Sequence, residues 1–197
     1  MAIQIEVHPT AKRAALVVGI AVLFVVGLTG LRSLLDKKEG AEVKTSSAPP
    51  NLDVWFSPNG GATEAIVKVI SGAGKTIEVQ AYSFTSAPIA EALIQAKRRG
   101  VEVTAILDDS QRADKNSQAN RIAEGGIATY FDSKHAIAHN KVIIVDGLSV
   151  VTGSFNFSKA AEENNAENLL VVRDAGVAGM YHANFRQHLG HSVPLRL

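Results

Sequence analysis

From about residue 52 onward, short runs of apolar residues alternate with segments whose apolar positions recur every three or four residues. The short runs are typical of strands, and the longer period is typical of amphipathic helices. Strands are expected over residues 54–57, 76–84, 101–107, 128–131, 142–145, 148–157 and 168–173. Helices are expected from residue 62, from 86 or 88 to 99, over 111–124 and over 177–189. This order predicts an α/β fold with a mixed β-sheet sandwiched between helices.

The N-terminal part of the chain has a different pattern. Ala14 to Leu31 are eighteen residues without a charge, and basic residues flank them on both sides. Such a stretch is long enough for a transmembrane helix, and the absence of a clear cleavage site favours an uncleaved anchor over a signal peptide. Residues 1–35 are therefore expected to form an N-terminal membrane anchor, with a cleaved signal segment or a buried helix as the alternatives. Residues 36–51 predict a flexible linker, and residues 52–197 a folded domain.

Composition narrows the class of protein. The chain has 197 residues, of which 46% are hydrophobic and 20% charged, as in an ordinary globular protein with a core. It has no cysteine, which excludes disulfides and thiolate zinc sites. From residue 49 onward there are 14 basic and 15 acidic side chains, so the domain is not a basic coat protein. Binding to nucleic acid would depend on local basic groups, each of which could equally be solvated helix surface: Lys97, Arg98, Arg99, Arg112, Lys115, Arg121 and Lys134.

The densest cluster of reactive side chains falls on a predicted hairpin. His139 and Lys141 precede an apolar run that ends at Asp146 before a glycine, which is a strong hairpin-turn signal. A two-residue turn would place position 139 opposite 154, and a four-residue loop would place it opposite 156. In either register Ser154 and Asn156 share a face with His139 and Lys141, while the phenylalanines at 155 and 157 point into the core.

This combination of side chains suits attack on a phosphodiester. An imidazole can serve as nucleophile, Lys141 can neutralise a phosphate oxygen, and Ser154 and Asn156 can hydrogen-bond the developing negative charge. A surface hairpin with a polar rim is the alternative, but the Gly-Ser-x-Asn-x-Ser run at 153–158 makes a chance pattern less plausible. This chemistry requires no metal, and we assign none.

The motif His-x-Lys-x4-Asp, followed by Gly-Ser-x-Asn, resembles the signature of the phospholipase D superfamily. In length and sequence the chain is similar to the small single-motif bacterial endonucleases of the Nuc type. The similarity runs from residues 54–58 through 81–85 to 167–168. The resemblance implies a phospholipase D-like fold, a phosphohistidine intermediate on His139, and phosphate binding by Lys141, Ser154 and Asn156. It also implies that Glu167 orients the His139 ring.

The resemblance further makes Asp146 a catalytic candidate. Seven residues along a strand reverse the face on which a side chain lies, and an Asp-Gly turn would by itself explain an aspartate at this position. The catalytic and structural interpretations of Asp146 both stay open.

A second imidazole is needed to protonate the leaving oxygen. None of the other histidines (His8, His135, His182, His188 and His191) is followed two residues later by lysine, so the chain carries one copy of the motif. Family members with one motif pair as homodimers, and we expect a homodimer in which two copies of His139 form one active site. The other histidines are expected to be surface or packing residues.

Two further motifs carry no predicted chemistry. The Gly-Ala-Gly-Lys-Thr run at 72–76 resembles a phosphate loop but leads into a strand rather than a helix. Asp108 and Asp109 could suggest a metal site, but acidic residues at a strand end are commonly caps.

The sequence predicts a metal-independent phosphodiesterase without cofactors. A sequence-nonspecific endonuclease that contacts the backbone phosphates of DNA, or of RNA, is the favoured function. The alternatives are a membrane-anchored phospholipid phosphodiesterase of the phospholipase D or cardiolipin hydrolase type, and a non-catalytic phosphate-binding module. Similarity to exported nucleases implies a periplasmic catalytic domain, anchored through residues 14–31 or secreted after cleavage of a signal.

Overall fold

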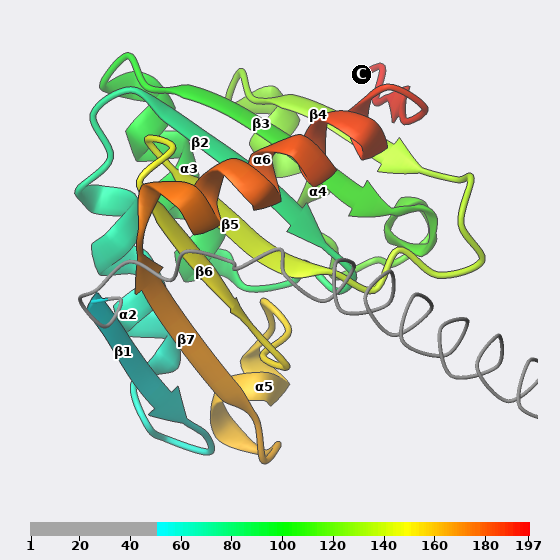
Figure 1. The fold of residues 1–197 in the computed structure, drawn as a ribbon. Coiled ribbons are helices and arrows are strands. Elements are labelled where there is room, and N and C mark those ends of the chain that lie inside the picture. The colour runs from blue at the N-terminus through cyan, green and yellow to red at the C-terminus, as the bar shows by residue number, and fades with distance from the viewer. Residues whose placement is uncertain (1–50) are drawn as a thin grey trace, which may run out of the picture. The chain divides into compact units, whose positions relative to one another are not determined.

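The computed structural model describes residues 51–197, which form a mixed eight-stranded sheet with helices on both faces (Figure 1). The strands lie in the order β1-β7-β6-β5-β2-β3-β4-β8. Their bounds are Asn51–Phe56 (β1), Thr76–Ala81 (β2), Glu102–Asp108 (β3), Ala128–Asp132 (β4), Lys141–Val145 (β5), Ser149–Gly153 (β6), Asn168–Arg173 (β7) and Val193–Pro194 (β8). The helices are Ala62–Ser71 (α2), Ala87–Arg98 (α3), Ala119–Glu124 (α4), Lys159–Glu163 (α5) and Ala175–Leu189 (α6), with a 3-10 turn at Asp109–Arg112 (η1). The predicted α/β fold is confirmed.

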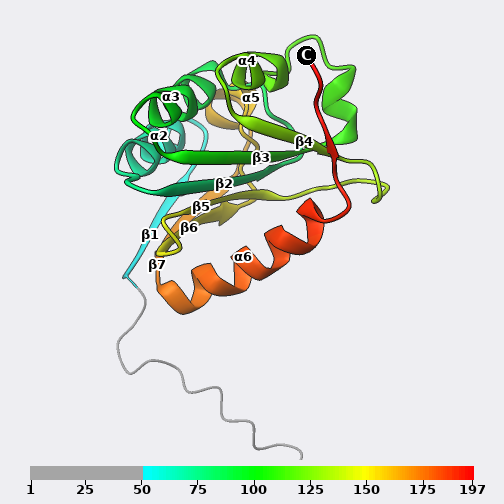
Figure 2. The ribbon, with the colours of Figure 1, turned by 90° about the horizontal axis from the view of Figure 1, so that it is seen from above.

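The two faces of the sheet are covered unequally. Helices α2, α3, α4 and α5 lie on one face and α6 lies alone on the other (Figure 2). Along β5, Ile143 and Val145 join the larger core under α2 and α3, whereas Val142 and Ile144 join the smaller core under α6. Because both faces are covered, all five residues of β5 are buried, which explains its uninterrupted apolar run.

Strand directions bring several chain segments to one edge of the sheet. β2, β3 and β4 are parallel to one another. On the other side of β2 every neighbouring pair is antiparallel: β2 with β5, β5 with β6, β6 with β7, and β7 with β1. Ala81 therefore pairs with Lys141, Gly153 with Leu169, and Phe56 with Asn168. The carboxyl ends of β1, β2, β3, β4 and β6 meet the amino ends of β5 and β7, and the loops at this edge carry most of the predicted site residues.

Several expected elements differ from those observed. The expected helix over 111–124 is divided, because η1 ends at Arg112 and α4 begins only at Ala119. Between them, Asp114 accepts the backbone N–H of Asn116 at 2.8 Å, so a short polar side chain takes a donor that a continuous helix would need. The strand expected over 76–84 ends at Ala81, while α5 and β8 were not foreseen.

The N-terminal predictions fall on another part of the chain. The predicted membrane helix at residues 14–31 and almost all of the predicted linker at 36–51 lie outside the described residues. Within residues 51–197, no helix is both long and apolar enough to cross a membrane.

Candidate active site

Lys141 is the first residue of β5 and is largely buried, with 7% of its surface exposed. Its Nζ donates to the carbonyl oxygen of His139 at 3.0 Å and lies 4.9 Å from the centroid of the Tyr82 ring. Burial lowers the pKa of the Lys141 ammonium, and the negative charges of Glu167 and Asp108 oppose this shift. An anionic phosphate beside Nζ would compensate for the lost hydration, so the arrangement suits phosphate binding.

His139 lies in the loop before β5, and its side chain is exposed. Its ring rests against Tyr82, with ring centroids 4.5 Å apart. The backbone is fixed on both sides, because Tyr82 N–H donates to Asn140 O at 2.8 Å and Ala138 N–H donates to Asp108 Oδ2 at 2.7 Å. Within the described part of the chain, neither ring nitrogen of His139 has a hydrogen-bond partner. The imidazole is therefore held in place but free to react.

Ser154 follows β6 at the same edge. Its Oγ accepts the backbone N–H of Asn168 at 3.0 Å and the side-chain Nδ2 of Asn168 at 3.3 Å. Gly153, with φ 145°, permits this approach, because a Cβ there would lie 2.3 Å from the carbonyl oxygen of Asn168. The serine hydroxyl consequently keeps its proton available for a ligand while two N–H groups occupy its oxygen.

Asn156 lies two residues further on, between two phenylalanines that are fully buried as predicted, Phe155 and Phe157. Its own side chain is half-buried, but its Oδ1 is buried and has no hydrogen-bond partner among residues 51–197. Buried polar atoms normally have a partner. This amide is therefore available to a ligand or to a group from another protein chain.

Glu167 immediately precedes β7 and is fixed through its backbone. Ser57 N–H donates to Glu167 O at 3.1 Å, and Glu167 N–H donates to Ser57 Oγ at 3.2 Å. The carboxylate accepts from Asn165 Nδ2 at 3.1 Å, and in the described residues it makes no hydrogen bond to the His139 ring. Its charge acts on Lys141, as noted above; orientation of the His139 ring by Glu167 stays a prediction.

The hairpin register differs from both predicted alternatives. Asp146 and Gly147 have positive φ angles of 55° and 64°, and Leu148 N–H donates to Val145 O at 3.0 Å, which closes a two-residue turn of type I′ geometry. The strands nevertheless pair Val145 with Ser149, so Leu148 is an extra residue. Both predicted registers were therefore wrong by one residue.

A second irregularity compensates for the first. The backbone N–H groups of Ser154 and Phe155 both donate to Asn168 O, at 3.1 and 3.2 Å. Two successive donors on one carbonyl are the mark of a β-bulge, which shifts the alternation of side chains by one position. Ser154 and Asn156 thus stay accessible at the site edge while the phenylalanines pack inward.

Asp146 lies at the opposite end of β5 from Lys141. Its carboxylate accepts the backbone N–H groups of Gly74, Lys75 and Thr76 at 2.9, 2.7 and 2.9 Å. Burial would raise the pKa of this carboxyl, but these three donors outweigh it and hold the pKa below its ordinary value. The phosphate-loop-like run at 72–76 therefore surrounds a carboxylate of the protein itself, and the geometry favours the structural interpretation of Asp146.

Two contacting residues were not identified as site residues from the sequence. Tyr82 supports both His139 and Lys141, and its signal is its position directly after β2. Asp108, 5% exposed, was expected to be a cap, and it does cap η1 through Ser110 N–H at 3.0 Å. Its second oxygen holds Ala138, and this contact across 30 residues leaves no local signal in the sequence.

Metal-ligand chemistry is concentrated elsewhere at this edge. Asp108 is committed to η1 and Ala138, as described, and Asp109 pairs with Arg112 at 2.7 Å. Among the described residues, the one group with ligand atoms close enough for a metal consists of Asp132, His135, His188 and His191. Three histidines expected to be ordinary surface or packing residues are therefore gathered around one carboxylate.

Comparisons with known proteins agree with this site. Residues 66–189 match the family described as cardiolipin synthase, PLD-like domain. The chain is 37% identical over 170 residues to a phospholipase D of Rickettsia typhi, covering 82% of this chain and 83% of that protein. It is 32% identical over 146 residues to the mitochondrial cardiolipin hydrolase of Xenopus laevis, covering 74% of this chain and 66% of that protein.

Similarity extends to a solved structure. The phospholipase D family member Nuc from Salmonella typhimurium superposes with a TM-score of 0.72 at 38% identity, covering 76% of this chain and 100% of that chain. The family match spans more than half of this chain and includes the segment that carries His139, Lys141 and Ser154. The chain therefore belongs to the phospholipase D superfamily and is an enzyme of this phosphodiesterase group.

Proposed function

We propose that this chain is a metal-independent, sequence-nonspecific endonuclease that cleaves DNA, with RNA as an alternative substrate, through a phosphohistidine on His139. The observation that carries the proposal is that the exposed imidazole of His139 and the buried ammonium of Lys141 lie at the same sheet edge, where Lys141 Nζ donates to the backbone carbonyl of His139. A free imidazole provides the nucleophile, and the desolvated cation provides a strong electrostatic partner for a phosphodiester.

The reaction proceeds in two displacements. A nitrogen of His139 attacks phosphorus, the P–N bond forms, and the bond to the leaving oxygen breaks as a second imidazole donates a proton to that oxygen. Water then attacks phosphorus, gives its proton to the second imidazole, and releases His139 by breaking the P–N bond. Lys141, Ser154 and Asn156 neutralise and hydrogen-bond the nonbridging oxygens as negative charge develops.

The second imidazole comes from His139 of a second copy of the chain. Two large apolar side chains flank the candidate site and are exposed: Phe56 at 68% and Ile137 at 58%. Phe56 precedes Ser57, which fixes Glu167, and Ile137 lies two residues before His139. An apolar rim around a half-site supports a symmetric contact that would complete it.

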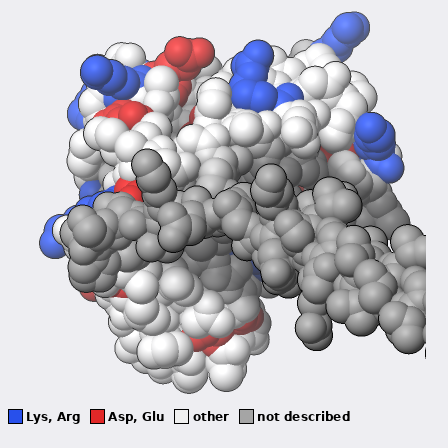
Figure 3. Space-filling model, viewed as in Figure 1, with Lys and Arg blue, Asp and Glu red and all other residues white. Residues whose placement is uncertain are grey.

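The charge distribution supports binding through a few contacts to backbone phosphates. On the face seen in Figure 3, Lys and Arg side chains form separate groups rather than a continuous patch. Three of the predicted basic residues are engaged within the fold: Arg99 with the carbonyls of Ile70 and Ser71, Arg112 with Asp109, and Arg121 with Glu91. Lys134 is exposed in the loop that leads to His139 and is well placed for a phosphate. With few such contacts, binding should weaken by about one to two orders of magnitude between 50 and 200 mM salt.

A phospholipid phosphodiester is the second candidate substrate. The names of the relatives favour it, since they include a phospholipase D and a cardiolipin hydrolase, and the exposed Phe56 and Ile137 could also meet a bilayer. A groove of about 990 Å3 lies between α2, α3 and α5, but it does not reach the candidate site, so it gives no support to acyl-chain binding beside His139. It is lined by five charged residues (Glu64, Lys68, Lys159, Glu162 and Glu163) and by none of the candidate site residues.

We also propose that residues 14–31 anchor the enzyme in a membrane, with the catalytic domain on the periplasmic side. The uncharged eighteen-residue run supports this. Membrane fractionation and protease accessibility of spheroplasts test it: recovery of the full-length chain in the soluble fraction would contradict the anchor, and protection from protease would contradict the orientation.

The test of function is a substrate panel for the full-length chain in detergent: single- and double-stranded DNA, RNA, and cardiolipin-containing micelles, in excess EDTA. His139→Ala is the catalytic variant, and His182→Ala, an exposed histidine on α6 paired with Glu78, is the matched control. Cleavage of nucleic acid by the wild type and the control, but not by His139→Ala, is expected. Turnover of lipid alone would replace the nuclease by the phospholipid enzyme, and no turnover would leave a phosphate-binding module.

A further inference from the structure

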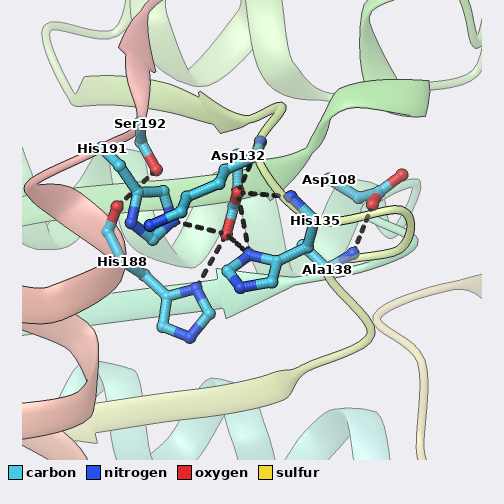
Figure 4. A network of polar contacts seen from close by, with 8 residues as sticks. Asp108, Asp132, His135, Ala138, His188, His191 and Ser192 are labelled. Carbon is cyan, nitrogen blue, oxygen red and sulfur yellow. Dashed lines mark hydrogen bonds and ion pairs between the residues drawn. The ribbon is translucent and has the colours of Figure 1, made fainter.

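Four side chains with metal-ligand chemistry converge where β4 meets the end of α6, and none of them is assigned to the phosphodiesterase site (Figure 4). Asp132 ends β4, His135 lies in the following loop, His188 is in the last turn of α6, and His191 follows that helix. One nitrogen from each imidazole and one carboxylate oxygen all lie within 4.8 Å of one another. Two segments more than fifty residues apart in the sequence thus meet at one point.

The contacts are concentrated on a single atom. Asp132 Oδ2 lies 2.7 Å from His188 Nδ1, 2.9 Å from His135 Nδ1 and 3.2 Å from His191 Nε2. The other oxygen, Oδ1, accepts the backbone N–H groups of Lys134 at 3.1 Å and His135 at 3.4 Å, and it also lies 3.2 Å from His135 Nδ1. A carboxylate has about four lone-pair positions, whereas three imidazole nitrogens and two backbone N–H groups converge on this one, which exceeds what directed hydrogen bonds can satisfy. A cation among the four groups would give each of them a bond.

The surroundings suit a cation. The Asp132 side chain has no exposed surface, and those of His188 and His191 are 15% and 22% exposed. The His135 side chain, at 44%, opens to solvent and provides a path for entry. The three rings lie with centroids 4.9 to 5.4 Å apart, so protonating all of them would place three positive charges side by side. Neutral imidazoles that share one divalent ion avoid that repulsion.

We propose that Asp132, His135, His188 and His191 form a structural site for a divalent transition-metal ion, best matched by zinc. Three imidazole nitrogens and one carboxylate oxygen are borderline ligands of the kind zinc prefers, whereas magnesium and calcium prefer oxygen alone. Zinc bonds of about 2.0 to 2.1 Å place tetrahedral ligands about 3.4 Å apart, so modest side-chain rotation would complete the site. Four protein ligands leave no open position, which distinguishes this site from a catalytic one.

The site would fasten two parts of the fold. It joins the end of α6 to the end of β4, beside the short pairing of β8 with β4. It also fixes His135 near the start of the loop that carries His139, while Asp108 holds Ala138 near the other end. The metal would thereby stabilise the loop that carries the nucleophile without taking part in the chemistry.

Metal analysis of the purified full-length chain tests the proposal. The protein is stripped with EDTA, returned to chelator-free buffer, loaded with Zn²⁺ and desalted, and zinc is measured by mass spectrometry. About one zinc per chain is expected, with a melting temperature at least about 5 °C above that of the stripped protein. Loading with Co²⁺ should give the intense visible absorption of a tetrahedral site. Substoichiometric zinc together with an unchanged melting temperature would overturn the proposal and leave a hydrogen-bonded network around Asp132.

Variants assign the ligands. His188→Gln and His191→Gln should each bind zinc at least tenfold more weakly and lose the cobalt spectrum, whereas His182→Gln on the same helix should behave as wild type. His191 lies outside α6, so its variant serves if His188→Gln does not fold. Unchanged zinc affinity in the folded variants would overturn the assignment. His139→Ala should bind zinc normally while losing activity, so failure of the metal site and failure of the proposed function are separately visible.

Discussion

The two ends of β5 use the residues of one motif in opposite ways. At the carboxyl end, the Asp146 carboxylate is satisfied by three backbone N–H groups. At the amino end, the Lys141 ammonium has one carbonyl partner, and the rings and amides around it keep unused hydrogen-bonding capacity. Full satisfaction is what folding stability requires, whereas unsatisfied groups at a fixed edge are what a ligand requires. The motif therefore combines a structural end and a chemical end on one buried strand.

Removal of the nucleophile should have the largest effect at the chemical end. His139→Ala is expected to lower kcat by about 10⁴-fold or more, because no other described imidazole lies at the same position. The exposed side chain makes few packing contacts, so the melting temperature should stay within about 1 °C of wild type. Steady-state cleavage and calorimetry of the same preparation check both; substantial residual turnover would assign the nucleophile to another residue.

Lys141→Met should come next, with a loss of about 10²- to 10³-fold in kcat/KM, because a desolvated cation is removed from the phosphate. Burial lowers the pKa of Lys141, so the charged form is disfavoured in the folded protein. Replacing it with an apolar side chain of similar length should therefore leave the free energy of unfolding unchanged or higher. A clear decrease in the free energy of unfolding would show that Lys141 stabilises the fold, and would contradict a role limited to substrate binding.

Asp108→Asn should have a smaller effect, about tenfold on kcat with little change in KM. The carboxylate accepts Ala138 N–H and positions the loop before His139 without touching substrate. Because asparagine keeps one acceptor oxygen, the loss should be partial, and Asp108→Ala should be worse. Equal activity of wild type and Asp108→Ala would contradict this positioning role.

Asp146→Ala should have the smallest effect on chemistry and a clear effect on folding. We expect kcat within about threefold of wild type below the melting temperature, and a free energy of unfolding lower by about 1–3 kcal/mol from lost charge-assisted hydrogen bonds. Denaturant unfolding and activity assays at low temperature separate the two. A collapse of kcat with unchanged stability would restore the catalytic interpretation of Asp146.

The same carboxylate predicts a pH dependence. The pKa of Asp146 in the folded protein is depressed below its ordinary value of 3.8, so its stabilising contribution is present above that value and is lost as the pH falls below it. The difference in unfolding free energy between wild type and Asp146→Ala should be constant from about pH 6 to 8 and shrink below about pH 4. If this difference in unfolding free energy did not change with pH, the charge of Asp146 would not be the cause of the stabilisation.

Much of the fold could be predicted from the sequence, because helices, strands and tight turns are determined largely by residues that are close together in the chain. The β7 strand and the start of α2 follow from apolar period, and the Asp-Gly turn follows from the positive φ that glycine and aspartate tolerate. The register of the β5–β6 hairpin could not be predicted, since the extra residue at Leu148 is decided by pairing along whole strands.

In the candidate site, too, some residues could be predicted from the local sequence and others depend on tertiary packing. The His-x-Lys spacing identified His139 and Lys141 from a few residues, and the sheet edge gathers Ser154, Asn156 and Glu167 with them. The support from Asp108 and the convergence of His188 and His191 on Asp132 arise from tertiary packing across 30 to 59 residues. No local pattern records such distances.

Trapping of the covalent intermediate tests the central claim most directly. Full-length protein is mixed with labelled oligonucleotide in EDTA, quenched in alkali within the first turnover, and digested for mass spectrometry. We predict an acid-labile, alkali-stable phosphoryl adduct on His139, absent from His139→Ala and present in His182→Ala. Turnover by the wild type with no adduct, or with the adduct on another residue, would contradict the account.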